Sequence, residues 1–158
     1  MKPASSDGAM RIQATLGDSF RVLEFDQSTH SSAEAAAAIG CDVAQIAKSM
    51  LFKAADGTAV LVVASGTNRV DEKKVAALLG QKISRADAGF VLDRTGFAVG
   101  GVPPVGHATP PMVFLDRDLQ AYSMIWAAAG SPNAVFALTP ADLVRLTGAD
   151  FVDVAKAG

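Results

Sequence analysis

The chain has 158 residues, of which 50% are hydrophobic and 19% are charged. This length is typical of one globular domain, and this balance excludes a disordered or low-complexity protein. The net charge of −2 excludes a general nucleic-acid coat protein. No apolar run approaches the ~20 residues of a membrane-spanning helix, and the first residues lack the apolar segment of a secretory signal, so we expect a cytoplasmic protein.

Residues 1–10 are expected to form a flexible tail, followed by a single domain over 11–158. The alternation of polar and apolar residues over 21–25 predicts a half-buried strand. Ser31 and Glu34 fit the capping box of an alanine-rich helix that ends at Gly40.

Two strands are predicted next and are joined by the hairpin signal Asp56-Gly57. Asp71 is expected to cap the following helix, and Thr139 and Asp142 fit a second capping box. The predicted strands are 48–53, 58–65, 97–99, 112–115, 124–128, 133–138 and 151–154, and the predicted helices are 72–79, 87–95 and 140–147. About seven strands and four helices without strict alternation predict an α+β domain built on a mixed sheet.

The most unusual segment is the glycine–proline loop, residues 100–107, with the sequence Gly-Gly-Val-Pro-Pro-Val-Gly-His. Glycine lets a ligand approach the main chain, and proline stiffens the loop and removes N–H donors. The remaining donors could converge on a carbonyl oxygen or a developing oxyanion. The alternative is a tight structural corner between two strands.

Lys48 shares its face of a predicted strand with the apolar residues Met50 and Phe52. An ammonium on such a face costs free energy unless it is paired or lies at a cavity mouth. Lys48 is therefore either a cation that faces the substrate or a side chain that snorkels from the rim of the sheet. His107 either contacts a ligand as a donor, acid or base, or anchors the loop.

One thiol and two imidazoles leave little material for a metal site, so we expect neither a metal nor a cofactor. Cys41 is expected to be a buried or idle thiol, and His30 to cap or pack beside a helix. Neither a Gly-x-Ser-x-Gly nor a His-Glu-x-x-His motif is present, and no Walker or dinucleotide glycine loop is found. Residues 48–94 carry a net charge of +3, which either meets an anionic ligand or is a solvated surface.

Several of these segments, in this order, resemble the YbaK/prolyl-tRNA-synthetase-associated domain family. The resemblance covers about residues 20–155 and is carried by residues 31–40, 46–52, 65–74, 95–97, 100–107 and 143–148. Members of this family are free-standing or appended editing domains that hydrolyse the ester of a wrongly charged aminoacyl-tRNA. The resemblance implies a curled mixed sheet flanked by helices, and it implies that the chain is an editing deacylase.

Lys48 stands at the position of the family's functional lysine, and residues 100–104 fit its Gly-x-x-x-Pro loop, whose backbone is taken to hold the aminoacyl carbonyl. The resemblance thus implies catalytic roles for Lys48, Gly100 and Gly101. The substrate contacts expected with it are Met50, Phe52, Val99, Val102, Pro104, Gly106 and His107. The expected tRNA contacts are Lys53, Arg69, Lys73 and Lys74. The loop departs from the Ile-Ser-Pro-Leu-Gly of cysteine-directed members, which argues against strict cysteine specificity.

The first functional hypothesis is a deacylase that acts in trans on tRNA(Pro) carrying a small amino acid such as alanine or cysteine. Its expected partners are the acceptor end of the mischarged tRNA and prolyl-tRNA synthetase or another synthetase, without a membrane. No convincing protein nucleophile is present, so the attacking group would come from water or from the substrate itself. The alternatives are a non-catalytic module that binds a tRNA end or an aminoacyl ligand, and a hydrolase of small acyl esters.

Overall fold

The computed structural model describes residues 1–27, 29 and 31–157. Its strands are β1 (Lys2–Pro3), β2 (Val22–Glu24), β3 (Ile46–Ala54), β4 (Ala59–Ser65), β5 (Ile83–Arg85), β6 (Met112–Asp116), β7 (Ile125–Ala128), β8 (Ala134–Leu138) and β9 (Phe151–Val152). Its α-helices are α1 (Asp7–Leu16), α2 (Ser32–Ile39), α3 (Glu72–Leu79), α4 (Ala88–Thr95) and α5 (Pro140–Thr147). The α+β class that the sequence predicts is confirmed.

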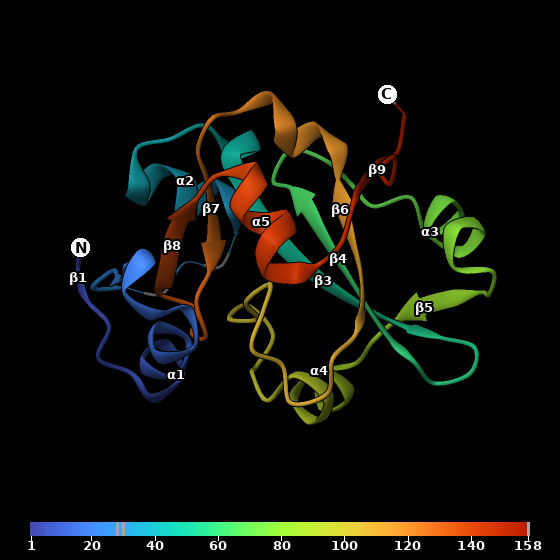
Figure 1. Cartoon of the computed structure of the whole chain (residues 1–158), viewed down its shortest axis with the longest axis horizontal. Helices are drawn as coiled ribbons and strands as arrows, with labels where there is room; N and C mark the ends of the chain where they lie inside the picture. Colours follow the sequence, from blue (N-terminus) through green and yellow to red (C-terminus); the bar gives the residue numbers. More distant parts are fainter. Residues whose placement is uncertain (28, 30, 158) are drawn as a thin grey trace.

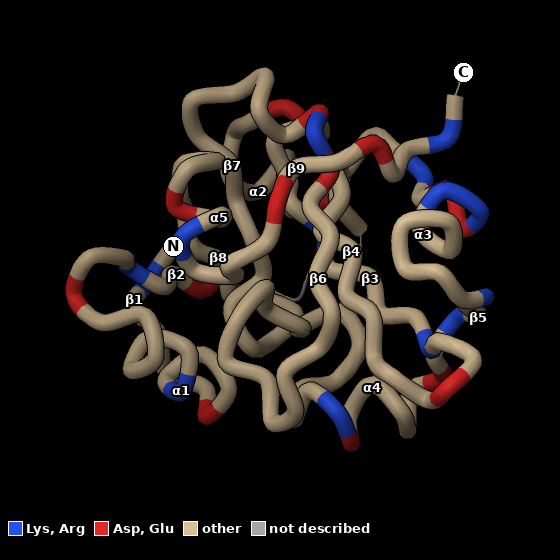
Figure 2. Tube along the Cα trace, turned by 45° about the vertical axis from the view of Figure 1, so that its right-hand side comes forward, with Lys and Arg blue, Asp and Glu red and all other residues tan. Residues whose placement is uncertain are grey.

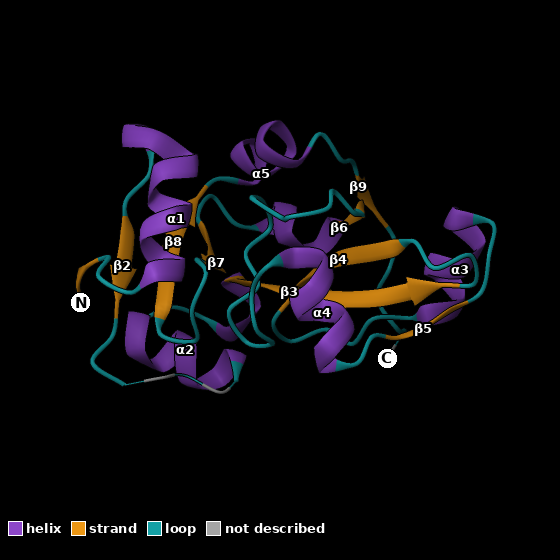
Figure 3. Cartoon of the chain, turned by 90° about the horizontal axis from the view of Figure 1, so that it is seen from below, coloured by secondary structure: helices purple, strands orange, loops and turns teal. Residues whose placement is uncertain are grey.

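All of these strands belong to one curled mixed sheet (Figure 1). The strand order is β1-β2-β8-β7-β3-β4-β6-β9, and β5 pairs with β3 beside this path. The pairs β3–β7, β4–β6 and β6–β9 are parallel, and the other pairs are antiparallel. Figure 3 shows α2 and α5 on opposite sides of the sheet, so that both faces are covered.

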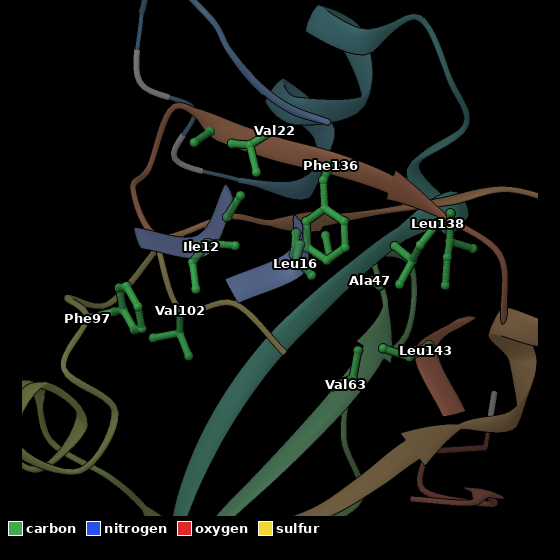
Figure 4. Packing of buried hydrophobic residues seen from close by; sticks show 14 of the residues in the cluster. Ile12, Leu16, Val22, Ala47, Val63, Phe97, Val102, Phe136, Leu138 and Leu143 are labelled. Carbon is green, nitrogen blue, oxygen red and sulfur yellow. The ribbon is translucent and has the colours of Figure 1, made fainter. Parts of the chain in front are cut away.

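The largest hydrophobic cluster joins the sheet to α1 and to the glycine–proline loop (Figure 4). It packs Ile12 and Leu16 of α1 with Phe136 of β8 and Val102 of the loop. A second cluster packs β4 against α3. Every residue of β4 is buried, which explains its continuous apolar sequence, since a strand covered on both faces needs no polar alternation.

The local signals in the sequence correspond to real element ends. Ser31 Oγ accepts a hydrogen bond from the N–H of Glu34 at 3.1 Å, and α2 ends at Gly40 with φ +87°. Thr139 and Asp142 form the reciprocal capping box at the start of α5. These side chains satisfy N–H groups that the first turn of a helix leaves unpaired.

The structure differs from the expected flexible tail over residues 1–10. These residues contain β1 and the first turn of α1, which begins after the N-cap Ser6. The helix forms because Ala9, Ile12 and Leu16 lie on one buried face. The carboxylate of Glu24 holds the segment in place by accepting hydrogen bonds from the main-chain N–H and hydroxyl groups of Ser5 and Ser6.

The number of elements also differs, with nine strands and five α-helices in the described residues instead of about seven and four. The additional elements are β1, β5 and α1. The predicted strand over 97–99 is wrong. The hydroxyl of Thr95 donates to the carbonyl of Val91 in α4 and accepts from the N–H of Phe97, which bends the chain there instead of extending it.

Candidate functional site

Within residues 1–27, 29 and 31–157, part of β3 has no strand partner on one edge. β4 pairs with β3 along one side, whereas on the other side β7 pairs with Ile46 and Ala47 and β5 pairs only from Phe52 onward. The edge is therefore open between these two strands, over residues 48–50, because the carbonyl of Leu51 already accepts a hydrogen bond from Ala86. Unpaired main-chain groups of this kind are available to a ligand.

Ser49 lies in the middle of this open edge. The N–H of Ala54 donates to Thr58 at the hairpin, whereas the carbonyl of Leu51 accepts from the N–H of Ala86 on the opposite side. Because successive residues of a strand alternate in direction, the odd-numbered residues turn their main-chain polar groups away from β4. Ser49 thus directs its N–H and its carbonyl into the gap.

Two cavities lie at the open edge, with volumes of about 380 Å³ and 260 Å³. The larger cavity extends from β3 to the start of α2 and to β7 and β8. The smaller cavity extends from β3 to β5 and α4 and is mostly apolar. Ser49, Met50, Gly100 and Val102 line both cavities and form the wall between them.

Lys48 lines the larger cavity, and its Nζ donates a hydrogen bond to the main-chain carbonyl oxygen of Asn68 at 2.6 Å. Burial lowers the pKa of Lys48, the carboxylate of Asp116 raises it in part, and the cation of Arg69 lowers it further. The side chain is therefore a positioned ammonium at the cavity and not a freely snorkelling one.

Asn68 and Asp116 are functional candidates that the sequence argument missed. The side-chain amide of Asn68 donates to Asp116 Oδ2 at 2.8 Å and to Asp118 Oδ2 at 2.7 Å. Asp116 is 1% exposed and also accepts a hydrogen bond from the N–H of Ser65 at 3.0 Å. The available signal was a carboxylate at the end of the apolar segment Met112–Asp116, because a buried charge needs partners of this kind.

The glycine–proline loop presents fewer free donors than the sequence suggests. The N–H of Gly101 donates to the carbonyl of Ala98 at 3.0 Å, and the carbonyl of Gly101 accepts from the N–H of Gly130 at 2.9 Å. The expectation that the Gly101 amide is open to a substrate is therefore wrong. Within residues 1–27, 29 and 31–157, the N–H groups of Gly100 and Val102 donate no hydrogen bond, and Gly100 is exposed with φ +93°.

Gly101 is required for a different reason, which is close packing. A Cβ atom at Gly101 would lie 2.8 Å from Cα of Ser131. Gly130, the residue before Ser131, contacts Gly8 of α1. A Cβ atom at Gly8 would overlap the carbonyl oxygen of Gly130. Helix α1 thus supports the loop through residues 130–131. Arg11 of α1 adds a contact of its own, since its guanidinium lies 4.5 Å from the ring centroid of Phe97.

The predicted substrate contacts divide into two groups. Met50, Phe52, Val99 and Val102 all line the smaller cavity, where Val99 is exposed at the rim. The other group, Pro104, Gly106 and His107, lines neither cavity.

His107 anchors the loop. Its Nε2 makes a hydrogen bond of 2.7 Å to the carbonyl of Pro103, an acceptor, so this nitrogen carries the proton. Burial lowers the pKa of His107 and the bond to Pro103 opposes this only in part, which favours a neutral ring.

The predicted tRNA contacts also differ in their surroundings. Lys74 donates to Asp153 at 3.0 Å and to the carbonyl of Ala155 at 2.8 Å, so its charge already has a partner. Lys53 lies 5.4 Å from the ring centroid of Phe90. Arg69 and Lys73 are exposed. Figure 2 shows blue positions along α3, the C-terminal segment and β5, on one side of the molecule.

Other candidate groups have no place in this site. Among the described residues, no three His, Cys, Asp or Glu side chains lie close enough together to hold a metal ion. Cys41 is half-buried, and burial raises the pKa of its thiol. His30 lies outside the described residues. Every described helix is too short or too polar to cross a lipid bilayer.

The structure is a one-sheet α+β domain with two cavities at an open strand edge, beside the hydrogen-bonded ammonium of Lys48 and the glycine–proline loop. The chain belongs to the aminoacyl-tRNA editing domain family, whose family model matches residues 26–146. The resemblance seen in the sequence is confirmed.

Relatives and a solved structure extend this result. The chain is 35% identical over 136 residues to the uncharacterised protein YwhH of Bacillus subtilis (85% of this chain, 87% of the relative). It is 27% identical over 156 residues to EbsC of Enterococcus faecalis, named as a candidate Cys-tRNA(Pro)/Cys-tRNA(Cys) deacylase (97% and 95%). A proline–tRNA ligase of Desulfovibrio desulfuricans is 35% identical over 106 residues, which are 66% of this chain and 18% of that enzyme. A structure described as a candidate trans-editing enzyme for prolyl-tRNA synthetase superposes with a TM-score of 0.92 at 43% identity, covering 98% of this chain and all of the other.

Proposed function

We propose that the protein is an aminoacyl-tRNA deacylase that acts in trans and hydrolyses the ester of a mischarged tRNA. One observation carries this proposal: Lys48, Gly100 and Val102 line the same cavity at the open edge of β3, and in the described part of the chain the N–H groups of Gly100 and Val102 donate no hydrogen bond. Preorganised donors around one point stabilise the negative charge that develops on an acyl oxygen during ester hydrolysis.

In this proposal the acyl carbonyl oxygen accepts hydrogen bonds from Gly100 and Val102. Lys48 orients the ester or the terminal ribose-phosphate. A water molecule, positioned by a hydroxyl of the terminal ribose, attacks the carbonyl carbon and gives up a proton. The ribose oxygen then leaves and takes up a proton, which releases the amino acid from the tRNA.

The attacking group is assigned to water, with help from the substrate, because no described His, Asp or Glu is present on the cavity walls to act as a general base. The described hydroxyl residues on these walls are Thr29, Ser31, Ser32 and Ser49. A protein hydroxyl is a weak nucleophile without an adjacent base. Catalysis would then depend on positioning and on charge stabilisation.

The two cavities suit two parts of this substrate. The smaller, apolar cavity is assigned to the side chain of a small amino acid such as alanine or cysteine. The larger cavity, which Trp126 and the start of α2 border, is assigned to the terminal nucleoside. An apolar pocket separates side chains by only about 1–3 kcal/mol per methylene, so related small amino acids would also be removed.

The proposed partners are the acceptor end of mischarged tRNA(Pro) and prolyl-tRNA synthetase or another synthetase, in the cytoplasm. The name of EbsC, the match to a proline–tRNA ligase and the description of the superposed structure all support this choice.

The decisive experiment is incubation of the protein with tRNA(Pro) charged with alanine, cysteine, serine or proline, and with the matching small aminoacyl esters. Loss of the wrong amino acid from tRNA, with proline retained, is the expected result. Binding of the charged tRNA without hydrolysis would instead indicate a non-catalytic module. Hydrolysis of the small esters alone would indicate an esterase of another kind.

A further inference from the structure

Ser49 carries a buried hydroxyl without a hydrogen-bond partner. Its Oγ is the one buried side-chain polar atom in the described part of the chain that lacks a partner. Leaving such a group unpaired costs folding free energy, because the group loses its hydrogen bonds to water and gains none in return. Buried hydroxyls are nearly always paired, so an exception at a ligand cavity indicates that the partner is supplied by the ligand.

Ser49 lines the smaller cavity, and its side chain lies on the face of β3 that packs towards two other residues of the cavity wall. Alternate residues of a strand share a face, so Ser49 lies on the same face as Ala47 and Leu51. Both residues pack with the cluster that contains Val91 and Val102, and these two residues line the smaller cavity. Ser49 and Arg85 are the only polar side chains among the described residues on its wall.

The charge of this cavity indicates which ligand group can pair with Ser49. Arg85 is a cation, and no described carboxylate lines either cavity, so a cationic α-amino group is disfavoured there. A neutral hydroxyl, by contrast, can both donate to and accept from Ser49. The smaller cavity is the one assigned above to the amino-acid side chain.

We propose that Ser49 determines specificity by hydrogen bonding to a hydroxyl on the side chain of the esterified amino acid, so that seryl and threonyl esters are preferred over alanyl and valyl esters. This inference rests on the proposed deacylase function and names the substrate class of the same site. A site with a buried polar group rejects an analogue that lacks the matching group, because its own group then stays unpaired.

The test compares two isosteric pairs on the same tRNA, serine with alanine and threonine with valine. The wild-type protein and Ser49→Ala are assayed for kcat/KM, with Ser84→Ala as the matched control, since Ser84 is an exposed serine on β5. The wild type and the control should prefer the hydroxyl member of each pair by about tenfold or more. In Ser49→Ala the ratio of the two kcat/KM values in each pair should fall close to one. Hydrolysis of the alanyl ester should be retained.

A second measurement does not depend on activity. Ser49→Ala removes an unpaired buried polar atom, so its thermal unfolding midpoint should equal or exceed that of the wild type. A lower midpoint would show that the hydroxyl already has a partner and would overturn the inference. Equal rates for both members of each pair in the wild type, or an unchanged preference in Ser49→Ala, would also overturn it. Failure to hydrolyse any of the four esters would instead reject the proposed deacylase function, and this inference with it.

Discussion

The ammonium of Lys48 and the main-chain carbonyl of Asn68 form a hydrogen bond of 2.6 Å across neighbouring segments of the chain. The side chain of Asn68 is itself bonded to the buried carboxylate of Asp116. Lys48 is thus held by a main-chain atom whose position a carboxylate fixes. This arrangement keeps the cation at the cavity wall without neutralising it through a direct ion pair.

Lys48→Ala should leave the fold intact and reduce deacylation by about 10²–10³-fold, the usual effect of removing one well-placed donor. The measurement is kcat/KM on a mischarged tRNA, with circular dichroism to establish folding. Lys156→Ala is the control, because Lys156 is an exposed lysine near the C-terminus. Full activity in a folded Lys48→Ala protein would remove Lys48 from the mechanism.

Asp116→Asn should change the pH dependence of deacylation. If the protonated form of Lys48 is required, activity falls as the pH rises through the pKa of Lys48, which burial already lowers. The charge of Asp116 raises that pKa in part, so its removal should move the alkaline loss of activity to lower pH. A kcat/KM profile against pH measures the shift, and Asp18→Asn, which changes an exposed carboxylate, should leave it in place. An unmoved profile would show that Asp116 is only structural.

Gly101→Ala should destabilise the protein, because the new methyl group would meet the backbone of Ser131. Overpacking of this kind typically costs about 1–3 kcal/mol. Gly89→Ala is the matched control in α4, where a Cβ atom finds ordinary contact distances and alanine has the higher helix propensity. Urea unfolding should therefore show a lower midpoint for Gly101→Ala and an equal or higher one for Gly89→Ala. Unchanged stability in Gly101→Ala would contradict the packing role.

Glu24→Gln should weaken the attachment of the N-terminal segment and make stability less dependent on acid pH. Burial alone would raise the pKa of Glu24, but the hydrogen bonds from Ser5 and Ser6 lower it from 4.5 to about 2. The group therefore contributes stability above pH 4.5, roughly 3 kcal/mol from the size of the shift, and this contribution is lost as the pH falls from 4.5 towards 2. Denaturant unfolding at pH 7 and pH 3 should show a smaller difference for the variant than for the wild type. Equal differences would exclude this carboxylate as a main source of acid sensitivity.

Arg69→Ala and Lys74→Ala should separate tRNA binding from structural support. Arg69 is exposed, so its removal should weaken tRNA binding and reduce the slope of log affinity against log salt by roughly one. Lys74 is bonded to Asp153 and to the carbonyl of Ala155, so its removal should mainly lower the unfolding midpoint. Filter binding at several salt concentrations, with Lys2→Ala as control, measures the first effect. An affinity that does not change with salt would contradict an electrostatic tRNA surface.

Features fixed by neighbouring residues could be predicted from the sequence, whereas features that depend on distant segments could not. The helix ends at Ser31, Gly40 and Thr139 follow from local hydrogen bonds and backbone angles. Helix α1 was missed because its short apolar face lies among glycine and polar residues and is stabilised by contacts far along the chain. The same reason applies within the site. Whether the amide of Gly101 is free depends on Ala98 and residues 130–131, and the partner of Lys48 depends on the turn after β4.

The contact between Gly8 and Gly130 bears on any attempt to redesign the domain. Two glycines from distant parts of the chain are in main-chain contact there. Ser131, which follows Gly130, packs with its main chain against Gly101. A chimaera that received only the glycine–proline loop of a relative would place it on a helix shaped for another loop. Exchange of substrate preference between relatives therefore requires that residues 1–16, 97–107 and 129–132 be transplanted together.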